Sequence, residues 1–295
     1  MKLRRISSLL VGFGLLFGGV LSAAENASFR KLTDIEYAQA DGHQLLLDLY
    51  IPAETKSAPL IVYVHGGAWR AGSKNSMPLT GLVDEGFAVA SIDYRLSPVA
   101  RFPAQAHDIK AAIRFLRATQ KKYGYAAEKV TITGSSAGAH LALLVGVTNG
   151  HKELEGTVGK HLDESSDVQA IVSYYGASNF LTILPQSTPH GLGVRIPALQ
   201  LLLGSQPEKT PDLAKLASPV FHVDKSDPAL LLLHGDQDPQ MPINQSHELH
   251  AKYKEVGLPV EFEVVHGAAH GGKLFYDEHR TRSVNAFLMQ HLRSN

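Results

Sequence analysis

The chain has 295 residues, with 28 basic and 28 acidic side chains and no cysteine. This balance, without a basic stripe, excludes nucleic acid as an expected partner, and the lack of cysteine excludes disulfides as a source of stability. A chain of this length can bury one large α/β core, so the hydrophobic interior must hold the fold together.

Residues 1–24 have the pattern of a secretory signal. Three basic residues among the first five precede an apolar run over residues 9–21, and small residues follow at 22–24. The run is shorter than the ~20 residues that a membrane-spanning helix needs, and four glycines interrupt it. We therefore expect cleavage near Ala24, a secreted or periplasmic location, and a mature domain over residues 25–295 that is not held in a membrane. A single membrane anchor is the alternative.

Eight short runs rich in branched apolar residues predict strands, because each is bounded by Gly, Pro, Asp or Asn. The runs cover residues 34–39, 44–51, 60–65, 87–94, 129–133, 168–175, 229–234 and 260–266. The first two alternate polar with apolar residues on either side of Asp41-Gly42, which predicts an antiparallel hairpin at a sheet edge. The later runs are almost wholly apolar, as strands covered on both faces must be.

Helical stretches separate the later strands. The periodicity predicts helices over residues 108–123, 137–147, 243–256 and 273–292. Strand and helix in alternation predict an α/β fold with an eight-stranded, mostly parallel sheet and helices on both faces. The proline-rich segment 177–223 is longer than a crossover helix needs, and we interpret it as a cap-like insertion over the sheet. A surface excursion without ligand contact is the alternative.

A candidate nucleophile lies in the sequence Gly134-Ser135-Ser136-Ala137-Gly138, between a predicted strand and a predicted helix. In an open α/β sheet, ligands bind outside the carboxyl ends of the strands. A tight turn between strand and helix holds the central serine in a strained backbone conformation, and flanking glycines leave room for it. Ser136 occupies the centre, and Ser135 is its neighbour.

A serine hydroxyl needs a histidine base, which in turn needs a carboxylate to orient it. Asp236 and Asp238 follow the seventh predicted strand, and His266 and His270 follow the eighth. We favour Asp238 because Pro239 directs its loop, whereas Asp236 suits a local turn. We favour His270 because the glycines around it let its loop fold back over the sheet.

The histidines also suggest a metal site as an alternative. His266 and His270 have the i, i+4 spacing of a zinc-binding helix, and His247 and His250 are close together. Glycine at position 267 replaces the glutamate of H-E-x-x-H, and no third ligand stands at a suitable spacing. We therefore predict no metal.

The segment "HGGAW" at residues 65–69 follows the third predicted strand. Acyl transfer creates a negatively charged oxygen that requires preplaced N–H donors. Gly67 and Ala68 are the candidate donors here, together with the N–H of Ala137. We predict that Trp69 lines the mouth of the site and binds substrate, with a buried structural role as the alternative.

Five motifs in this order, "HGGAW", "DYRLSP", "GSSAG", "HGDQDPQMP" and "GAAHGG", resemble those of the α/β-hydrolase superfamily. Within it, they resemble hormone-sensitive-lipase-like and feruloyl-esterase-like (BD-FAE type) carboxylesterases. The resemblance implies cofactor-independent hydrolysis in which Ser136 attacks an ester carbonyl, His270 transfers the proton and Asp238 orients His270. Many of these esterases carry H-G-G-G, and Ala68 departs from that pattern.

The resemblance and the leader together imply a secreted or periplasmic serine carboxylesterase. Its expected partners are small-molecule or oligosaccharide esters, either short-chain or carbohydrate-linked acetyl and feruloyl esters. An arylformamidase-like amide hydrolase shares the H-G-G-x-W signature and is the first alternative. A serine peptidase of the same fold and a catalytically silent binding protein are the others.

Overall fold

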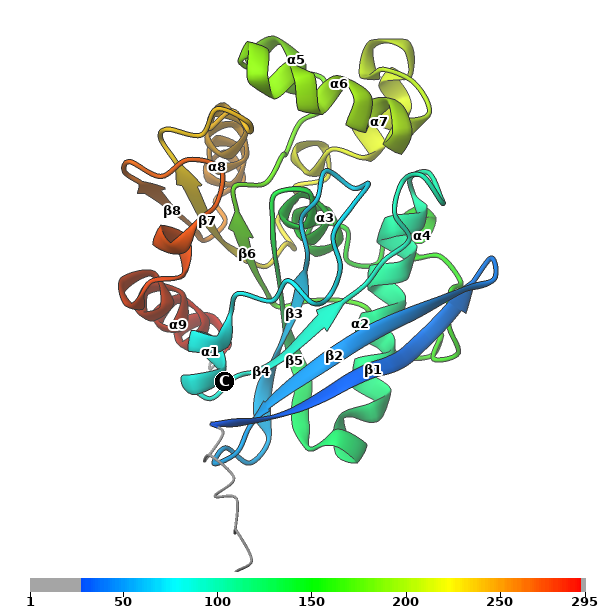
Figure 1. Ribbon diagram of the computed structural model, residues 1–295, viewed down its shortest axis with the longest axis vertical. Coiled ribbons are helices and arrows are strands. Elements are labelled where there is room, and N and C mark those ends of the chain that lie inside the picture. The colour runs from blue at the N-terminus through cyan, green and yellow to red at the C-terminus, as the bar shows by residue number, and fades with distance from the viewer. Residues whose placement is uncertain (1–27, 293–295) are drawn as a thin grey trace, which may run out of the picture.

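An eight-stranded sheet crosses the whole molecule (Figure 1). The computed structural model describes residues 28–292, so the predicted signal at 1–24 lies outside the described residues. The strands are β1 (Phe29–Ala40), β2 (His43–Pro52), β3 (Ala58–Val64), β4 (Ala88–Ile92), β5 (Tyr125–Ser135), β6 (Ala170–Tyr174), β7 (Ala229–Gly235) and β8 (Val260–Val265). Their spatial order is β1-β2-β4-β3-β5-β6-β7-β8.

The sheet is antiparallel only at its N-terminal edge. β1 pairs with β2 and β2 with β4 in antiparallel fashion, and every later pairing is parallel. The predicted α/β fold with an eight-stranded, mostly parallel sheet is therefore confirmed. The hairpin turn is Asp41-Gly42, and both residues have the positive φ that a two-residue hairpin requires.

β1 begins at Phe29, five residues before the predicted strand. Its first half is an edge strand with alternating exposed polar residues, and two register shifts interrupt its pairing with β2. A run of this kind carries little apolar signal, which is why the pattern revealed only its second half.

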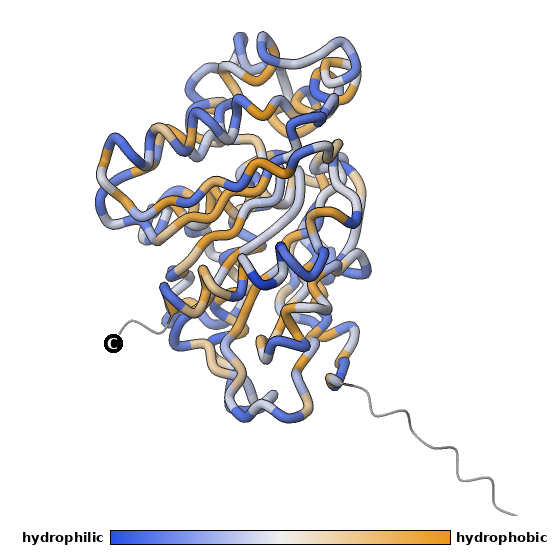
Figure 2. Tube along the Cα trace, turned by 90° about the vertical axis from the view of Figure 1, so that its left-hand side faces the viewer, coloured by the Kyte–Doolittle hydropathy of each residue, from blue (hydrophilic) through white to orange (hydrophobic). Residues whose placement is uncertain are grey.

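Helices cover both faces of the sheet (Figure 1). The helices α2 (Ala104–Tyr123), α3 (Ala137–Gly146) and α8 (Asn244–Val256) contribute to one buried cluster, and α1 (Thr80–Asp84) and α9 (Glu278–Leu292) to a second. Figure 2 shows hydrophobic residues along the interior strands and hydrophilic ones along the outer helices. Two apolar clusters on opposite faces are what a parallel sheet needs, because its strands are buried on both sides.

The C-terminal helix is shorter than predicted. Residues 273–292 divide into a 3₁₀ turn, η3 (Lys273–Tyr276), and α9. The break lies at Asp277, whose backbone is extended and whose carboxylate accepts a hydrogen bond from the Arg280 N–H at 2.9 Å. Asp277 therefore acts as the N-cap that starts a new helix.

Residues 177–223, called the cap below, lie above the carboxyl edge of the sheet (Figure 1). They contain α5 (Ile183–Gln186), α6 (Pro189–Leu203), η1 (Pro207–Lys209), α7 (Pro211–Leu216) and η2 (Pro219–Phe221). Four of its prolines occupy the first position of a helix, where a missing N–H costs nothing. These four prolines therefore start helices within the cap.

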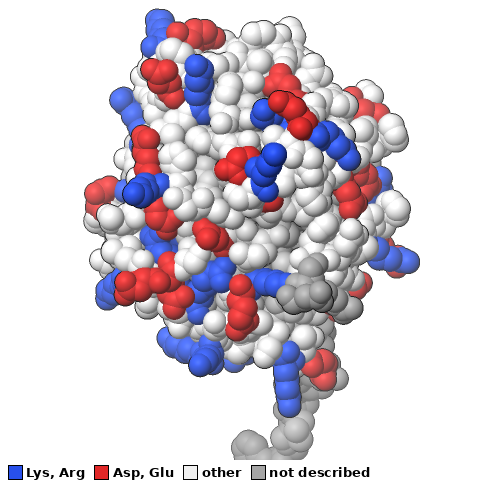
Figure 3. All heavy atoms as spheres, turned by 180° about the vertical axis from the view of Figure 1, so that it is seen from behind, with Lys and Arg blue, Asp and Glu red and all other residues white. Residues whose placement is uncertain are grey.

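The surface carries charges of both signs. On the face seen in Figure 3, Lys and Arg side chains are interspersed with Asp and Glu. The short helix α4 (Lys152–Glu155) contributes Glu155, which pairs with the buried Lys110 and Arg114 of α2. Across residues 28–292, no helix has the length and apolarity needed to cross a membrane.

Two glycines allow α3 to approach β3 very closely. A Cβ atom on Gly138 would lie 2.1 Å from the Val64 carbonyl oxygen and 2.4 Å from that of His65. A Cβ on Gly134 would lie 2.5 Å from the Gly138 carbonyl. All three distances are far below van der Waals contact, so the turn between β5 and α3 requires glycine at its two ends.

We expect Gly138→Ala to lower the free energy of unfolding by about 1–3 kcal/mol or more, because the backbone of β3 cannot move away from the added methyl. Gly193→Ala is the matched control, since Gly193 is exposed on α6 with nothing within 4 Å of its Cβ position. That control should be neutral or stabilise the helix by ~0.5–1 kcal/mol. Thermal melting of both variants measures the difference, and equal melting temperatures would contradict the close-packing argument.

Candidate active site

Ser136, His270 and Asp238 form one hydrogen-bonded chain at the carboxyl edge of the sheet. The Nε2 atom of His270 lies 2.8 Å from the Ser136 Oγ, and its Nδ1 lies 2.7 Å from the Asp238 Oδ2. With Nδ1–H donating to the carboxylate, Nε2 is free to accept the serine proton. This is the geometry of a nucleophile, a general base and the group that orients the base.

Ser136 lies in the turn between β5 and α3, with φ 53° and ψ −119°. A non-glycine residue with this backbone is strained, and such strain concentrates at functional sites. The Ser136 N–H donates to the Tyr174 carbonyl at 2.9 Å, and the close-packed glycines on either side hold the turn. The strained conformation that the motif predicted is therefore present.

The Asp238 carboxylate is fully buried and still charged. Its Oδ1 accepts hydrogen bonds from the N–H groups of Gln240 and Met241, both at 2.8 Å. Burial by itself raises the pKa of Asp238, but the hydrogen bonds from His234 and His270 outweigh that effect and hold it well below its usual range. A charged carboxylate keeps the proton of His270 on Nδ1.

His234, at the end of β7, is a contributor that the sequence reasoning missed. Its Nε2–H donates to the Met241 carbonyl at 3.0 Å and lies 3.5 Å from the Asp238 Oδ2. Its Nδ1 hydrogen-bonds with the Ser246 Oγ at 2.7 Å, and its side chain is buried. The sequence could have indicated His234 by its position, because it ends a buried predicted strand and lies four residues before Asp238.

The alternative residues Asp236 and His266 form a separate pair. The His266 Nδ1 lies 2.8 Å from the Asp236 Oδ2, and the Gly267 N–H donates to the Asp236 Oδ1 at 2.8 Å. The His266 side chain is 84% exposed, so this pair closes a surface turn. Only the pair of Asp238 and His270 is hydrogen-bonded to Ser136.

The remaining histidines do not gather into a ligand set. His247 and His250 lie on α8 with their rings 5.0 and 5.9 Å from the ring of Phe262. In the part of the chain that the structure describes, no three His, Cys, Asp or Glu side chains are arranged to hold a metal ion.

The HGGAW loop (residues 65–69) lies directly against the turn of Ser136. A Cβ on Gly66 would lie 2.9 Å from the Ser135 carbonyl and 3.4 Å from the Ser136 Cβ. Gly67, Ala68 and Trp69 have φ values of 115°, 51° and 59°, three successive residues in the left-handed region. The loop is thus strained at the point where it reaches the nucleophile.

Within this loop, glycine is required at position 67. A Cβ there would lie 2.0 Å from the Ala71 carbonyl, whereas Ala68 carries its own methyl group at φ 51°. Ala137 is the first residue of α3, and the N–H groups of a helix's first turn have no partner within the helix. The N–H of Ala137 is therefore available to a ligand beside Ser136.

Trp69 does not lie at the mouth of the site, contrary to the expectation that it binds substrate. Its side chain has no exposed surface, and its Nε1–H donates to the His140 Nδ1 at 3.1 Å. An indole buries a large apolar area once its single donor is satisfied, and His140 satisfies it. Trp69 thus has the structural role.

A pocket of about 390 Å³, called the tyrosine pocket below, opens beside Ser135, the neighbour of Ser136. It is lined by Tyr63, residues 75–78, Ser135, Tyr175 and Tyr276. The Tyr63 hydroxyl hydrogen-bonds with the Ser135 Oγ at 2.9 Å, and the Tyr175 and Tyr276 hydroxyls lie 3.1 Å apart. The Tyr175 ring is 4.9 Å from the His270 ring, edge to face, so the pocket adjoins the base.

Burial raises the pKa of Tyr63, Tyr175 and Tyr276, so their hydroxyls stay protonated and can donate to a bound group. The sequence did not reveal this pocket. Tyr63 and Tyr175 belong to predicted strands, where an aromatic residue is expected for packing alone.

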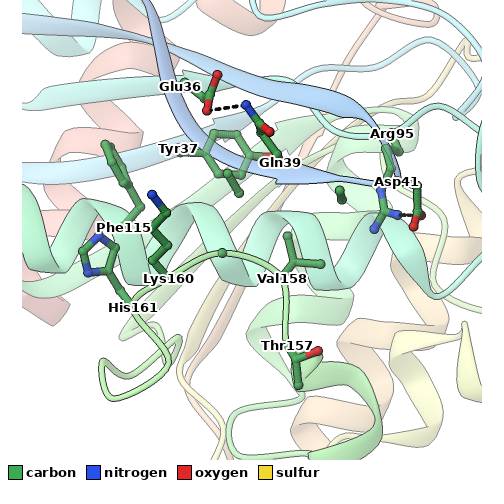
Figure 4. A pocket seen from close by; sticks show the side chains of 13 residues that line it. Glu36, Tyr37, Gln39, Asp41, Arg95, Phe115, Thr157, Val158, Lys160 and His161 are labelled. Atoms are coloured by element: carbon green, nitrogen blue, oxygen red, sulfur yellow. Dashed lines mark hydrogen bonds and ion pairs between the residues drawn. The ribbon is translucent and has the colours of Figure 1, made fainter.

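Another hollow, of about 700 Å³, lies between the β1–β2 hairpin, α2 and residues 157–161 (Figure 4). It shares no residue with the tyrosine pocket. The Arg95 guanidinium points toward Asp41 in Figure 4 and also hydrogen-bonds to the buried Asp108 of α2. Arg95 and Asp41 therefore form an ion pair at this hollow, and none of the predicted site residues lies there.

Comparisons with known proteins identify the family of the chain. The BD-FAE family model matches residues 47–253. The esterases LipC and LipQ of Mycobacterium tuberculosis are 31% and 33% identical, over 74% and 77% of this chain. The alignments cover 54% and 53% of those two proteins, so the chain spans about half the length of the curated relatives it matches.

Solved structures also resemble this chain. A truncated carbohydrate esterase from gut microbiota is 34% identical, with a TM-score of 0.83 over 92% of this chain and 99% of that one. A bifunctional GH43-CE protein of Bacteroides eggerthii is also 34% identical, with a TM-score of 0.80 over 88% of this chain and 35% of that one. The resemblance drawn from the five motifs is thus confirmed, and the chain belongs to the BD-FAE family of α/β-hydrolases.

Proposed function

We propose that this chain is a serine carboxylesterase that uses Ser136, His270 and Asp238 as a catalytic triad. The observation that carries the proposal is the continuous hydrogen-bonded chain from the serine hydroxyl through the imidazole to a buried carboxylate. The strained backbone of Ser136 supports it, because the sharp turn exposes the hydroxyl above the sheet.

The reaction follows from the proton positions. His270 Nε2 takes the hydroxyl proton while the Ser136 Oγ attacks the ester carbonyl carbon, and the charged Asp238 stabilises the imidazolium that forms. The imidazolium then gives the proton to the leaving alcohol, which leaves an acyl-enzyme. Water, activated by the same histidine, attacks the acyl-enzyme and releases the acid. No step in this sequence requires a cofactor.

The N–H groups of Gly67, Ala68 and Ala137 are the donors that we assign to the oxyanion. The close approach of the HGGAW loop to the Ser136 turn supports this assignment, as does the position of Ala137 at the start of α3. Each such donor is worth about 10²–10³-fold in kcat when it is preplaced.

The substrate class that fits is a short-chain ester or an acetyl or feruloyl ester of a carbohydrate. The tyrosine pocket adjoins the base and combines flat apolar rings with protonated hydroxyls, which suits a sugar or an aromatic ring. The signal pattern of residues 1–24 supports a secreted or periplasmic location and a substrate outside the cytoplasm.

Ser136→Ala should abolish hydrolysis of a short nitrophenyl ester and labelling by a fluorophosphonate probe, because no other group in the site supplies the nucleophile. Ser135→Ala is the matched control at the adjacent serine and should still be labelled. Mass spectrometry of the labelled wild-type chain should place the adduct on Ser136. An adduct on Ser135, or near-normal turnover by Ser136→Ala, would contradict the assignment.

Asp238→Asn should lower kcat by about 10³–10⁴-fold, because the amide stabilises the wrong tautomer of His270. Asp236→Asn should leave kcat within about twofold of wild type, since that carboxylate serves a surface turn outside the hydrogen-bonded chain of Ser136. Steady-state kinetics on the same ester tests both variants. The reverse order of effects would exchange their roles.

A panel of esters from acetyl to decanoyl, with acetylated sugars, a feruloyl ester and an aryl formamide, tests the substrate class. We expect kcat/KM for acetyl and sugar-linked esters to exceed that for decanoyl esters by at least tenfold, because the tyrosine hydroxyls that line the pocket can pair with a sugar but not with an alkyl chain. A preference for the formamide would favour the arylformamidase alternative, whose signature H-G-G-x-W this chain shares at residues 65–69.

A further inference from the structure

The only tryptophan of the chain, Trp69, is anchored by its side chain beneath the cap. Its Nε1–H donates to the His140 Nδ1 at 3.1 Å, and the two rings meet edge to face at 5.3 Å. The Phe180 ring packs edge to face against the indole at 5.4 Å and stacks on His140 at 4.5 Å. Trp69, the last residue of the HGGAW loop, is therefore held by side chains of α3 and the cap.

His140 links three segments that meet at the site. It belongs to α3, and its N–H donates to the Ser136 carbonyl at 3.0 Å. Its Nδ1 accepts from Trp69, and its Nε2–H donates to the Ala217 carbonyl of the cap at 2.7 Å. Burial lowers the pKa of His140 to about 4, so the imidazole is neutral near pH 7. These partners require the tautomer protonated on Nε2.

The buried cation of Arg195 connects the cluster of Trp69, His140 and Phe180 with the loop after β7 that carries Asp238. Arg195 of α6 is fully buried, with its guanidinium carbon 5.9 Å from the centre of the Trp69 ring and its Nη2 3.5 Å from the Gln240 carbonyl. The cap is fixed to α8 as well, because Gln245 accepts hydrogen bonds from the N–H groups of Ser178 and Asn179 at 2.9 and 2.8 Å. The cap is thus bonded to the rest of the domain on several sides.

The HGGAW loop needs these contacts because its backbone is strained. Ala68 and Trp69 both have positive φ, and each such residue costs of order 1–3 kcal/mol unless its surroundings compensate. The Ser97 N–H donates to the Trp69 carbonyl at 2.8 Å, and the Arg70 and Ala71 N–H groups donate to the Gly67 carbonyl at 3.1 and 3.0 Å. The side chain of Trp69 adds an anchor to the cap and α3, one residue after the proposed oxyanion donors.

We propose that Trp69 and His140 are positioning residues, which hold the HGGAW loop against the Ser136 turn through the cap carbonyl of Ala217. The inference rests on the proposed function, because the loop matters only if its N–H groups bind an oxyanion. It assigns the cap a role as a fixed brace of the catalytic geometry. Loosening the anchor should weaken binding of the transition state and leave binding of the substrate unchanged.

The test compares four variants of the full chain. His140→Ala removes both hydrogen bonds, and His140→Gln restores an acceptor for the indole and a donor for Ala217. Trp69→Phe keeps an aromatic ring without the donor. Tyr125→Phe is the matched control, because it removes a buried hydrogen bond to the Leu116 carbonyl, 2.8 Å long, between residues outside the site.

We expect His140→Ala to lower kcat by about 10–100-fold, less than the loss of a whole donor, with KM changed by less than about twofold. The rate of fluorophosphonate labelling should fall in parallel, since the phosphoryl oxygen occupies the same site. His140→Gln should recover most of kcat, and Tyr125→Phe should retain it. Tryptophan emission, which comes from Trp69 alone, should shift in His140→Ala and return toward the wild-type spectrum in His140→Gln.

A folded His140→Ala variant with wild-type kcat would overturn the inference, and so would a variant whose whole loss lies in KM. If His140→Ala does not fold, the kcat and labelling rate of Trp69→Phe decide the question in the same way. A wild-type chain that neither hydrolyses esters nor reacts with the probe would overturn the proposed function, and this inference with it. An active wild type with equally active variants would overturn the inference alone.

Discussion

The close approach of α3 to β3 is the constraint on which the rest of the site depends. Gly138 touches the backbone carbonyls of Val64 and His65, so the turn that bears Ser136 and the start of the HGGAW loop are in direct contact. Because both are backbone contacts, no side-chain rearrangement can relieve them. The nucleophile and its proposed oxyanion donors are therefore positioned by the same packing that joins the helix to the sheet.

The charge of Asp238 is stabilised by groups that the fold brings to one place. Two backbone N–H groups, His234 and His270 surround a carboxylate that has no exposed side-chain surface. Burial makes each of these hydrogen bonds stronger than it would be in water. The exposed pair of Asp236 and His266 has the same chemistry, but solvent weakens it and no bond joins it to the serine.

The strands and the motif residues were predictable because they depend on local patterns. Seven of the eight strands begin and end within a few residues of the predicted bounds, since buried parallel strands read as continuous apolar runs. β1 was predicted too short because an exposed edge strand has a weaker pattern. Pro239 and the glycines around residue 270 favoured Asp238 and His270, and the structure joins these two residues and Ser136 by hydrogen bonds.

Side-chain partners that come from distant segments were not predictable in this way. Trp69 was expected at the mouth of the site, but His140 and the cap enclose it, and no spacing in the sequence links residues 69, 140 and 217. The tyrosine pocket likewise joins β3, β5, the residue that follows β6, the loop at residues 75–78 and η3.

By itself, the sequence determined the order of strands and helices, the glycine-flanked serine and the short set of candidate acids and bases, because each depends on residues close together in the chain. Only the tertiary structure decided which aspartate and which histidine reach Ser136, and that Trp69 is an anchor. Those choices depend on burial and on contacts between segments up to 134 residues apart, which arise only when the sheet assembles.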